Sequence, residues 1–233
     1  MDATLRSLAG TRIWLPPNAK PGQITQLQGT PVSIGGPLDH AGFWAQDPHD
    51  PTAGWIPFAV EVKNIRGWIY PWDPEIWDLL AKVASFPDVV PVLVARKMHY
   101  ISFRMLKDLG GLGTQTGKQL FADRGTTRAS IDPDRFAEVT SGLSLRDCKL
   151  VDPTSPSSRL QKFFGETAYK LIDGASLAVN SQARWQATAP IVAQFAELRD
   201  DTLPMSRRTD LWKAFGREVE RAGLMGEGGW VTA

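Results

Sequence analysis

The sequence FAVEVKN, residues 58–64, is the stretch that decides the expected fold. It is typical of an apolar β-strand, yet it carries an acid and a base one residue apart. Because strand side chains alternate between faces, Glu61 and Lys63 are expected on one side of a sheet, with Val60 and Val62 on the other. Two charges on a buried strand cost free energy unless the protein uses them. This pair is therefore the first candidate for a functional site.

A second carboxylate is expected to join this pair. The segment GGPLD, residues 35–39, is a glycine turn that delivers Asp39. Residues 45–54 are rich in turn formers and are most simply a hairpin loop that separates Asp39 from the strand of Glu61. Two converging carboxylates are the ligands that Mg²⁺ or Mn²⁺ prefers. Asp39, Glu61 and Lys63 thus predict a metal site with an attacking water, where Lys63 orients or deprotonates that water or holds the scissile phosphate.

The residues after this strand predict a β-α-β crossover. Asp73 is a candidate N-cap followed by Pro74, and apolar residues then recur at helical spacing. Residues 89–95 are almost wholly apolar, as in a strand that is buried on both faces. The order strand, helix, strand predicts parallel strands with a right-handed connection. A further helix is expected over residues 100–109, ended by Gly110.

These elements predict an α/β protein with a central mixed sheet flanked by helices. The 233 residues suffice for one large domain or for a core with a small second unit. Residues 152–158 are rich in Pro and Ser and form the best linker candidate, and residues 159–222 are mainly helical in pattern. We therefore divide the chain into an α/β core, residues 1–150, and a helical C-terminal region, residues 151–233. Pro190 is expected to begin one of its helices.

The chain resembles the PD-(D/E)xK phosphodiesterase superfamily in three successive features. These are Gly36-x-x-Asp39, then Glu61-Val62-Lys63 in a strand, then a helix and a second strand. Restriction enzymes, Holliday-junction resolvases and repair nucleases share its restriction-endonuclease-like fold. The resemblance covers residues 31 to about 121, and its motif is short. It implies that Asp39 and Glu61 bind a metal together with the Val62 carbonyl, and that Lys63 is the catalytic lysine. It further implies a metal-dependent endonuclease that hydrolyses nucleic acid, DNA in preference to RNA.

Two features of that superfamily are matched less closely. Many members add an acidic residue from an N-terminal helix, whereas Asp2 is the only acid here before Asp39, and no Glu precedes Glu61. Members often carry a polar Gln or Lys on the helix after the core strands, for which Gln115 or Gln119 is the nearest match. The missing acid motivates a second hypothesis. In it, the chain is a catalytically inactive, nuclease-like subunit that binds nucleic acid or acts as a scaffold in a larger complex.

Positive charge gathers downstream of the second strand. Residues 96–128 contain seven Lys or Arg and two Asp, a local charge of +5 on a chain whose total is +1. A face that tracks phosphates and an ordinary solvated surface explain this equally well. Of the tryptophans near the site, Trp68 and Trp72 are placed to stack on unpaired bases, although most tryptophans pack in cores. The candidate nucleic-acid-binding residues are Asn64, Arg66, Arg96, Lys97, Arg104, Gln115, Lys118 and Gln119.

Composition narrows the class of protein. A net charge of +1, with 42% hydrophobic and 22% charged residues, is ordinary for a globular protein and excludes a uniformly basic nucleic-acid coat. The single cysteine, Cys148, cannot form an internal disulfide, which favours a reducing cytoplasm. No signal peptide or membrane-spanning run is visible, so no membrane partner is expected. A homodimer, a protein partner for the C-terminal helices and a clamp on the substrate all stay open.

Overall fold

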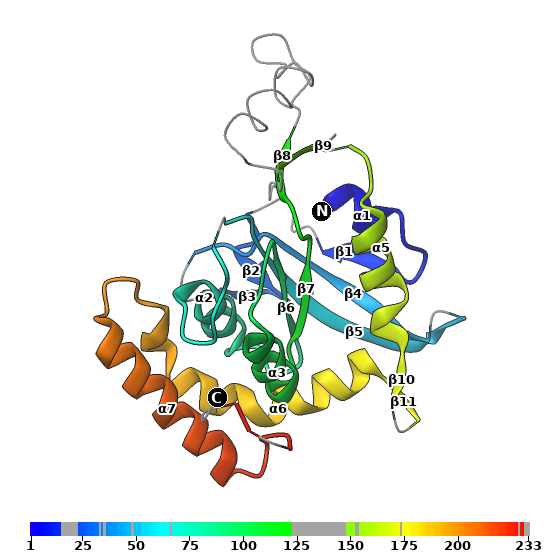
Figure 1. The fold of residues 1–233 in the computed structure, drawn as a ribbon. Helices are drawn as coiled ribbons and strands as arrows, with labels where there is room; N and C mark the ends of the chain where they lie inside the picture. The colour runs from blue at the N-terminus through cyan, green and yellow to red at the C-terminus, as the bar shows by residue number, and fades with distance from the viewer. Residues whose placement is uncertain are drawn as a thin grey trace.

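The centre of the molecule is a five-stranded sheet with the order β1-β4-β5-β6-β7 (Figure 1). The computed structural model describes residues 1–14, 23–32, 34, 36–47, 49–65, 67–122, 148–151, 154–172, 174–227 and 229–230. Strands β1, β4 and β5 are antiparallel, whereas β5, β6 and β7 are parallel. The prediction of an α/β protein with a central mixed sheet is confirmed. The strands are β1 (Thr11–Trp14), β4 (His40–Asp47), β5 (Asp50–Lys63), β6 (Val90–Ala95) and β7 (Leu112–Gln115).

Strands β4 and β5 form the expected hairpin, but its loop is much shorter than residues 45–54. Strand pairing continues to Asp47 and Asp50, and the Asp47 Oδ1 atom accepts a hydrogen bond of 2.8 Å from the His49 amide. The turn chemistry is concentrated at the tip, so the rest of this segment pairs as strand. His40 lies opposite Val60 in the register. Asp39, directly before β4, is thereby placed at the carboxyl end of β5.

The β-α-β crossover is present as predicted. Helix α2 (Pro74–Val83) connects β5 to β6, and helix α3 (Tyr100–Leu109) connects β6 to β7. Every residue of β6 is buried, as its apolar sequence requires. The parallel register sets Glu61 beside Leu93 and Lys63 beside Ala95. The carboxyl ends of β5 and β6 therefore meet at one edge of the sheet, which is where open α/β sheets bind ligands.

Helices cover both faces of the sheet. On one face, Ala59 and Leu93 pack with side chains of α2, α3, α6 (Leu177–Gln194) and α7 (Met205–Arg221). On the other face, Phe58 and Val60 pack with α1 (Asp2–Arg6) and α5 (Ser158–Gly165). The strand alternates as predicted, because Ala59 and Val60 belong to different cores. Glu61 and Lys63 consequently face α2, and Val62 packs on the α1 and α5 side.

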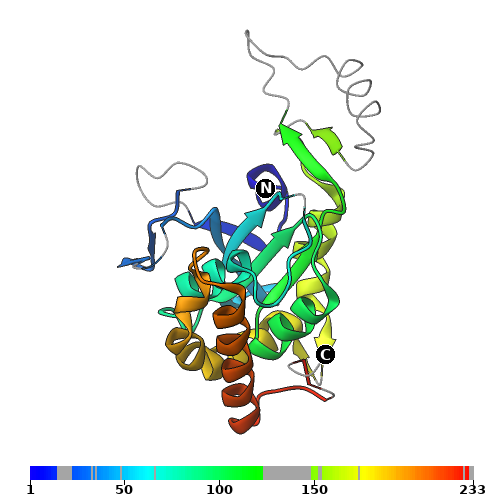
Figure 2. The same ribbon diagram turned by 60° about the vertical axis from the view of Figure 1, so that its left-hand side comes forward.

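The C-terminal helices are integral to these layers. Helix α6 runs along the sheet end opposite the carboxyl end of β5, and α7 follows it (Figures 1 and 2). Trp185 in α6 donates a hydrogen bond of 3.1 Å to the Phe86 carbonyl, just before β6. Pro190 lies inside α6 and does not begin a helix. This correction has a physical reason, since burial of Trp185, Ala189 and Val192 holds the helix together across the proline.

The remaining elements are short. Gln115 and Gln119, the nearest matches to a helical Gln, lie instead on β7 and on β8 (Gln119–Ala122). Strand β8 pairs with β9 (Cys148–Val151) in a ribbon that projects from the main body (Figures 1 and 2). No helix in the described part of the chain is long and apolar enough to cross a membrane. The other elements are β2 (Gln26–Leu27), β3 (Thr30–Pro31), β10 (Leu171–Ile172), β11 (Ala175–Ser176), η1 (Thr167–Tyr169) and η2 (Ala196–Arg199).

Gly110, at the end of α3, lies directly against the backbone of α6, so a substitution there tests how these two helices pack. It ends α3 with a φ of 85°, and a Cβ atom there would overlap backbone atoms of Ser181 and Trp185. Gly110→Ala should lower the free energy of unfolding by about 3 kcal/mol, because the left-handed strain and the overlap add. Gly174 has a similar φ of 84° with nothing within 4 Å, so Gly174→Ala should show only the strain, about 1 kcal/mol. Urea denaturation measures the loss of unfolding free energy in each variant. Equal losses in the two variants would contradict the overlap of a Cβ at Gly110 with α6.

Candidate functional site

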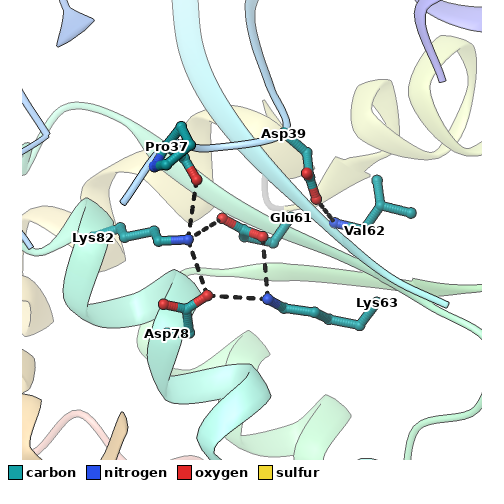
Figure 3. A network of polar contacts seen from close by, with 7 residues as sticks. All are labelled: Pro37, Asp39, Glu61, Val62, Lys63, Asp78 and Lys82. Atoms are coloured by element: carbon teal, nitrogen blue, oxygen red, sulfur yellow. Dashed lines mark hydrogen bonds and ion pairs between the residues drawn. The ribbon is translucent and has the colours of Figure 1, made fainter. Parts of the chain in front are cut away.

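The hairpin brings Asp39 to the middle of the Glu61–Lys63 segment. The Asp39 Oδ2 atom accepts a hydrogen bond of 2.7 Å from the Val62 amide (Figure 3). Val62 lies between Glu61 and Lys63, and the Lys63 Nζ atom is 3.3 Å from Glu61 Oε2. The three side chains that the sequence predicts to act together are therefore gathered at one place.

Glu61 is buried, with 3% of its surface exposed, and both of its carboxylate oxygens contact an ammonium group. Lys63 contacts Oε2, and Lys82 of α2 donates a hydrogen bond of 2.6 Å to Oε1. Burial raises the pKa of Glu61 above its ordinary value, and the negative charge of Asp39 adds to the rise, while Lys63 and Lys82 oppose it. The Glu61 carboxylate is thus costly to keep charged, and the two lysines offset part of that cost.

Helix α2 contributes two residues that the sequence analysis missed, Asp78 and Lys82. The Lys82 Nζ atom donates to Glu61 Oε1, to Asp78 Oδ2 at 2.9 Å and to the Pro37 carbonyl at 3.1 Å (Figure 3). An ammonium group has three donors, so all of them are used. A signal was present in the sequence, because Asp78 and Lys82 are one helical turn apart and Lys82 directly precedes the buried Val83.

Lys63 is held in its charged form. Burial alone would lower the pKa of Lys63, but the carboxylates of Glu61 and Asp78 outweigh burial and raise it. Its Nζ atom lies 3.0 Å from Asp78 Oδ2, and 20% of its side chain is exposed. Of the roles open to Lys63, this environment favours a positive charge that binds a phosphate or orients water over a base that removes a proton.

The oxygen donors suit a hard divalent cation in kind. Carboxylates of Asp39 and Glu61 with the Val62 carbonyl are the ligand types that Mg²⁺ and Mn²⁺ take. Asp39 disfavours the charged form of Glu61, and a cation beside both carboxylates would relieve that repulsion. Within the described residues no group of three His, Cys, Asp or Glu side chains is placed to hold a metal ion. An ion must also displace an ammonium group to reach a Glu61 oxygen.

The N-terminal helix does not supply a further acid to this site. Asp2 in α1 pairs with Arg6 at 2.8 Å, and α1 packs on the face of the sheet opposite Glu61. The third carboxylate of the polar network instead comes from Asp78 of α2. The network thus draws its third carboxylate from α2 and not from α1, and Asp78 is paired with both lysines.

An open pocket of about 520 Å³ reaches the network at Lys63 and Asp78. Four acids and two bases line it, so its wall favours a cation over a phosphate group as the first occupant. A phosphodiester would need added positive charge to approach Lys63 through this pocket. The lining residues are Lys63, Pro74, Glu75, Asp78, Arg199, Asp200 and Asp201.

The candidate nucleic-acid-binding residues do not all share one exposed face. Arg96 is only 2% exposed, which corrects its assignment as a surface cation, since the buried end of β6 places it inside. Gln115 lies on β7 and donates a hydrogen bond of 3.3 Å to the Met98 carbonyl, so it is not the helical Gln of the resemblance. Gln119 lies on strand β8. Arg66 is outside the described residues.

The other candidates lie nearer the surface. Asn64, directly after β5, and Lys118, in the turn before β8, are exposed. The Arg104 side chain donates a hydrogen bond to the Glu227 carbonyl. Lys97 lies over the ring of Trp68 at 5.8 Å, and Trp68 is 49% exposed. These two residues form a cation-aromatic surface beyond the carboxyl ends of β5 and β6.

Most of the tryptophans clustered in the sequence are structural. Trp44 and Trp77 are fully buried in the two cores, as the core-packing interpretation predicts. Trp72 is partly buried, stacks on Tyr70 at 5.4 Å and meets Trp212 of α7 edge-on. Trp68 alone among these four offers a large exposed ring.

His40, directly after Asp39, gives the fold a specific pH dependence. Burial lowers the pKa of His40 from 6.5 to about 4, so the imidazole is neutral at pH 7. Because the folded-state pKa is depressed, its contribution to stability is present above pH 6.5 and is lost as pH falls towards 4. We expect a loss of about 2–3 kcal/mol over this range that His40→Asn removes, as measured by urea denaturation at stepped pH. An unchanged pH profile in the variant would contradict this assignment.

Comparison with known proteins identifies no relative from which a function could be transferred, so the function must be argued from the site residues themselves. No family model matches the chain, and neither a curated protein nor a solved structure matches it significantly.

Proposed function

We propose that this protein is a divalent-metal-dependent endonuclease that hydrolyses phosphodiester bonds of nucleic acid. The observation that carries the proposal is the hydrogen bond from the Val62 amide to Asp39, which holds that carboxylate against the backbone of the strand segment that carries Glu61 and Lys63. DNA is the expected substrate on the sequence resemblance alone. A cytoplasmic location and a homodimer or a protein partner at the C-terminal helices belong to the same proposal.

The chain's own residues divide the work as follows. Asp39, Glu61 and the Val62 carbonyl would hold Mg²⁺ or Mn²⁺, which supplies an activated water and neutralises phosphoryl charge when bound. Lys63, held protonated and partly exposed at the pocket, would offer a positive charge to a phosphate oxygen once a bound cation offsets the acidic wall. Asp78 fixes the Lys63 ammonium group from α2 at 3.0 Å. Trp68 and Lys97 offer a ring and a charge to a nucleic acid strand beyond the pocket.

A cleavage assay with matched variants tests the proposal. Labelled duplex, branched and single-stranded DNA and RNA are incubated with the full chain in Mg²⁺, in Mn²⁺ and in EDTA. We expect cutting of at least one substrate that EDTA abolishes. Glu61→Gln should reduce the rate at least about a thousandfold, since it removes a ligand charge and leaves the shape of the side chain.

A control variant distinguishes loss of chemistry from loss of fold. Lys162→Met changes an exposed lysine on α5, on the far side of the sheet, and should cut at the wild-type rate. Cutting that persists in EDTA or in Glu61→Gln would show that a different site, or a contaminant, is responsible. Absence of cutting on every substrate would reject the enzyme.

One observation favours the alternative, a nuclease-like protein that binds nucleic acid or a scaffold partner without turnover. Both oxygens of Glu61 are engaged by lysines, and the two lysines also share Asp78, so the polar network is complete without a metal. Such a protein should bind nucleic acid equally well with and without EDTA. Its affinity should also be unchanged by Glu61→Gln.

A further inference from the structure

A cation position lies between β5 and α2, and an ammonium group fills it. Three oxygen atoms from three segments converge on the Lys82 Nζ atom: Glu61 Oε1 at 2.6 Å, Asp78 Oδ2 at 2.9 Å and the Pro37 carbonyl at 3.1 Å. The Lys82 side chain is 4% exposed. Two carboxylates and a carbonyl are the donors that a hard metal ion takes, yet here they surround a lysine.

The four side chains that form the ion-pair network carry two negative and two positive charges. Glu61 and Asp78 face Lys63 and Lys82, and each lysine contacts both carboxylates. Asp39 is bonded to the Val62 amide and adds a negative charge near Glu61. A divalent ion that binds Asp39 and Glu61 would place two positive charges beside two ammonium groups. Such an ion and the Lys82–Glu61 contact therefore compete for the same carboxylate.

We propose that Lys82 is a built-in counter-cation of the metal site, which holds Glu61 until a divalent cation takes that carboxylate from it. The inference rests on the proposed metal site and adds its regulation. Lys82 acts through Glu61 and is a positioning residue, whereas Lys63 at the open pocket faces the substrate. Without metal the Lys82–Glu61 pair keeps the buried carboxylate neutralised, and metal affinity is set below what the oxygen ligands alone would reach.

The test is Mn²⁺ affinity, measured by calorimetry on the full chain without nucleic acid. Lys82→Met removes the competing charge and should bind Mn²⁺ at least about tenfold more tightly than the wild type, given the coupling of close charge pairs. A gain in affinity is a readout that mere damage to the fold does not produce. Asp78→Asn is the opposing variant: it takes a partner from both lysines, leaves them to Glu61, and should weaken Mn²⁺ binding.

Folding is checked by circular dichroism before binding is measured. If Lys82→Met does not fold without metal, Lys82→Gln takes its place, because an amide can still donate to Glu61 without carrying a charge. In either variant, the midpoint of thermal unfolding should rise with added Mn²⁺ more than it does in the wild type. Lys162→Met should match the wild type in affinity and in midpoint.

The outcomes separate this inference from the nuclease proposal. Equal or weaker Mn²⁺ binding in the Lys82 variants, or no binding in any protein, overturns the counter-cation. Tighter binding without cleavage of any nucleic acid supports the counter-cation and rejects the nuclease. Cleavage with unchanged affinity supports the nuclease and rejects the counter-cation.

Discussion

Lys63→Met should lower the rate of metal-dependent cleavage about a thousandfold without weakening metal binding. Lys63 is charged, reaches the open pocket and contacts Glu61 at 3.3 Å, so its removal takes away a charge that meets the phosphate. It also frees one oxygen of Glu61 from an ammonium group. Metal affinity is therefore expected to stay level or rise while the rate falls. Single-turnover cleavage and Mn²⁺ calorimetry on the same preparation measure the two quantities.

The matched control is again Lys162→Met, whose lysine is exposed on α5. A parallel loss of metal binding and rate in Lys63→Met would show that this lysine supports the metal site and does not act on the phosphate. Lys63→Arg keeps the charge and should recover part of the rate, although a planar guanidinium does not reproduce the geometry of an ammonium group.

In the metal-free protein, Lys82→Met should lower the free energy of unfolding by about 3–5 kcal/mol, the usual effect of removing one partner of a buried ion pair. Glu61 would remain buried with only Lys63 to offset its charge. Glu61→Gln in the same background removes that charge, so the double variant should recover most of the loss. Urea denaturation of the wild type, the two single variants and the double variant gives the coupling energy between Lys82 and Glu61. Strictly additive effects would contradict a direct interaction between them.

The loss of unfolding free energy in Lys82→Met should depend on pH, and the titration of Glu61 sets the direction of that dependence. Burial raises the folded-state pKa of Glu61, so its favourable contribution is complete below the unfolded-state pKa and is lost as pH rises through the folded-state pKa. Without Lys82 this pKa rises further, because a group that lowers it is gone. The difference in stability between wild type and Lys82→Met should therefore be largest at neutral pH and shrink towards acid pH.

Much of the fold could be predicted because its signals are local. Pro74 and the apolar spacing after it mark α2, and Gly110 ends α3 through a positive φ. The alternation of residues 58–64 placed Glu61 and Lys63 on one face, which the two separate cores confirm. Asp39 could be brought to them because a hairpin joins strands that are adjacent in the sequence. Each of these inferences needs only neighbouring residues and the geometry of one strand pair.

The predictions that were wrong concern features that depend on contacts between elements far apart in the sequence. Pro190 was expected to begin a helix, but the packing of α6 across the sheet end continues the helix through it. Arg96 looked like a surface cation, yet the end of β6 is covered. Gln115 and Gln119 were matched to a helix, but they lie on two strands of different sheets, β7 and β8.

By itself, the sequence determined the acid-and-base strand, its parallel partner and the carboxylate delivered beside it. Only the tertiary structure decided what surrounds that strand: α2 docks so that Asp78 and Lys82 complete a polar network around Glu61. The reason is that a side chain's neighbours along one strand follow from a two-residue repeat, whereas a lysine's partner across a helix–sheet interface depends on how both surfaces pack.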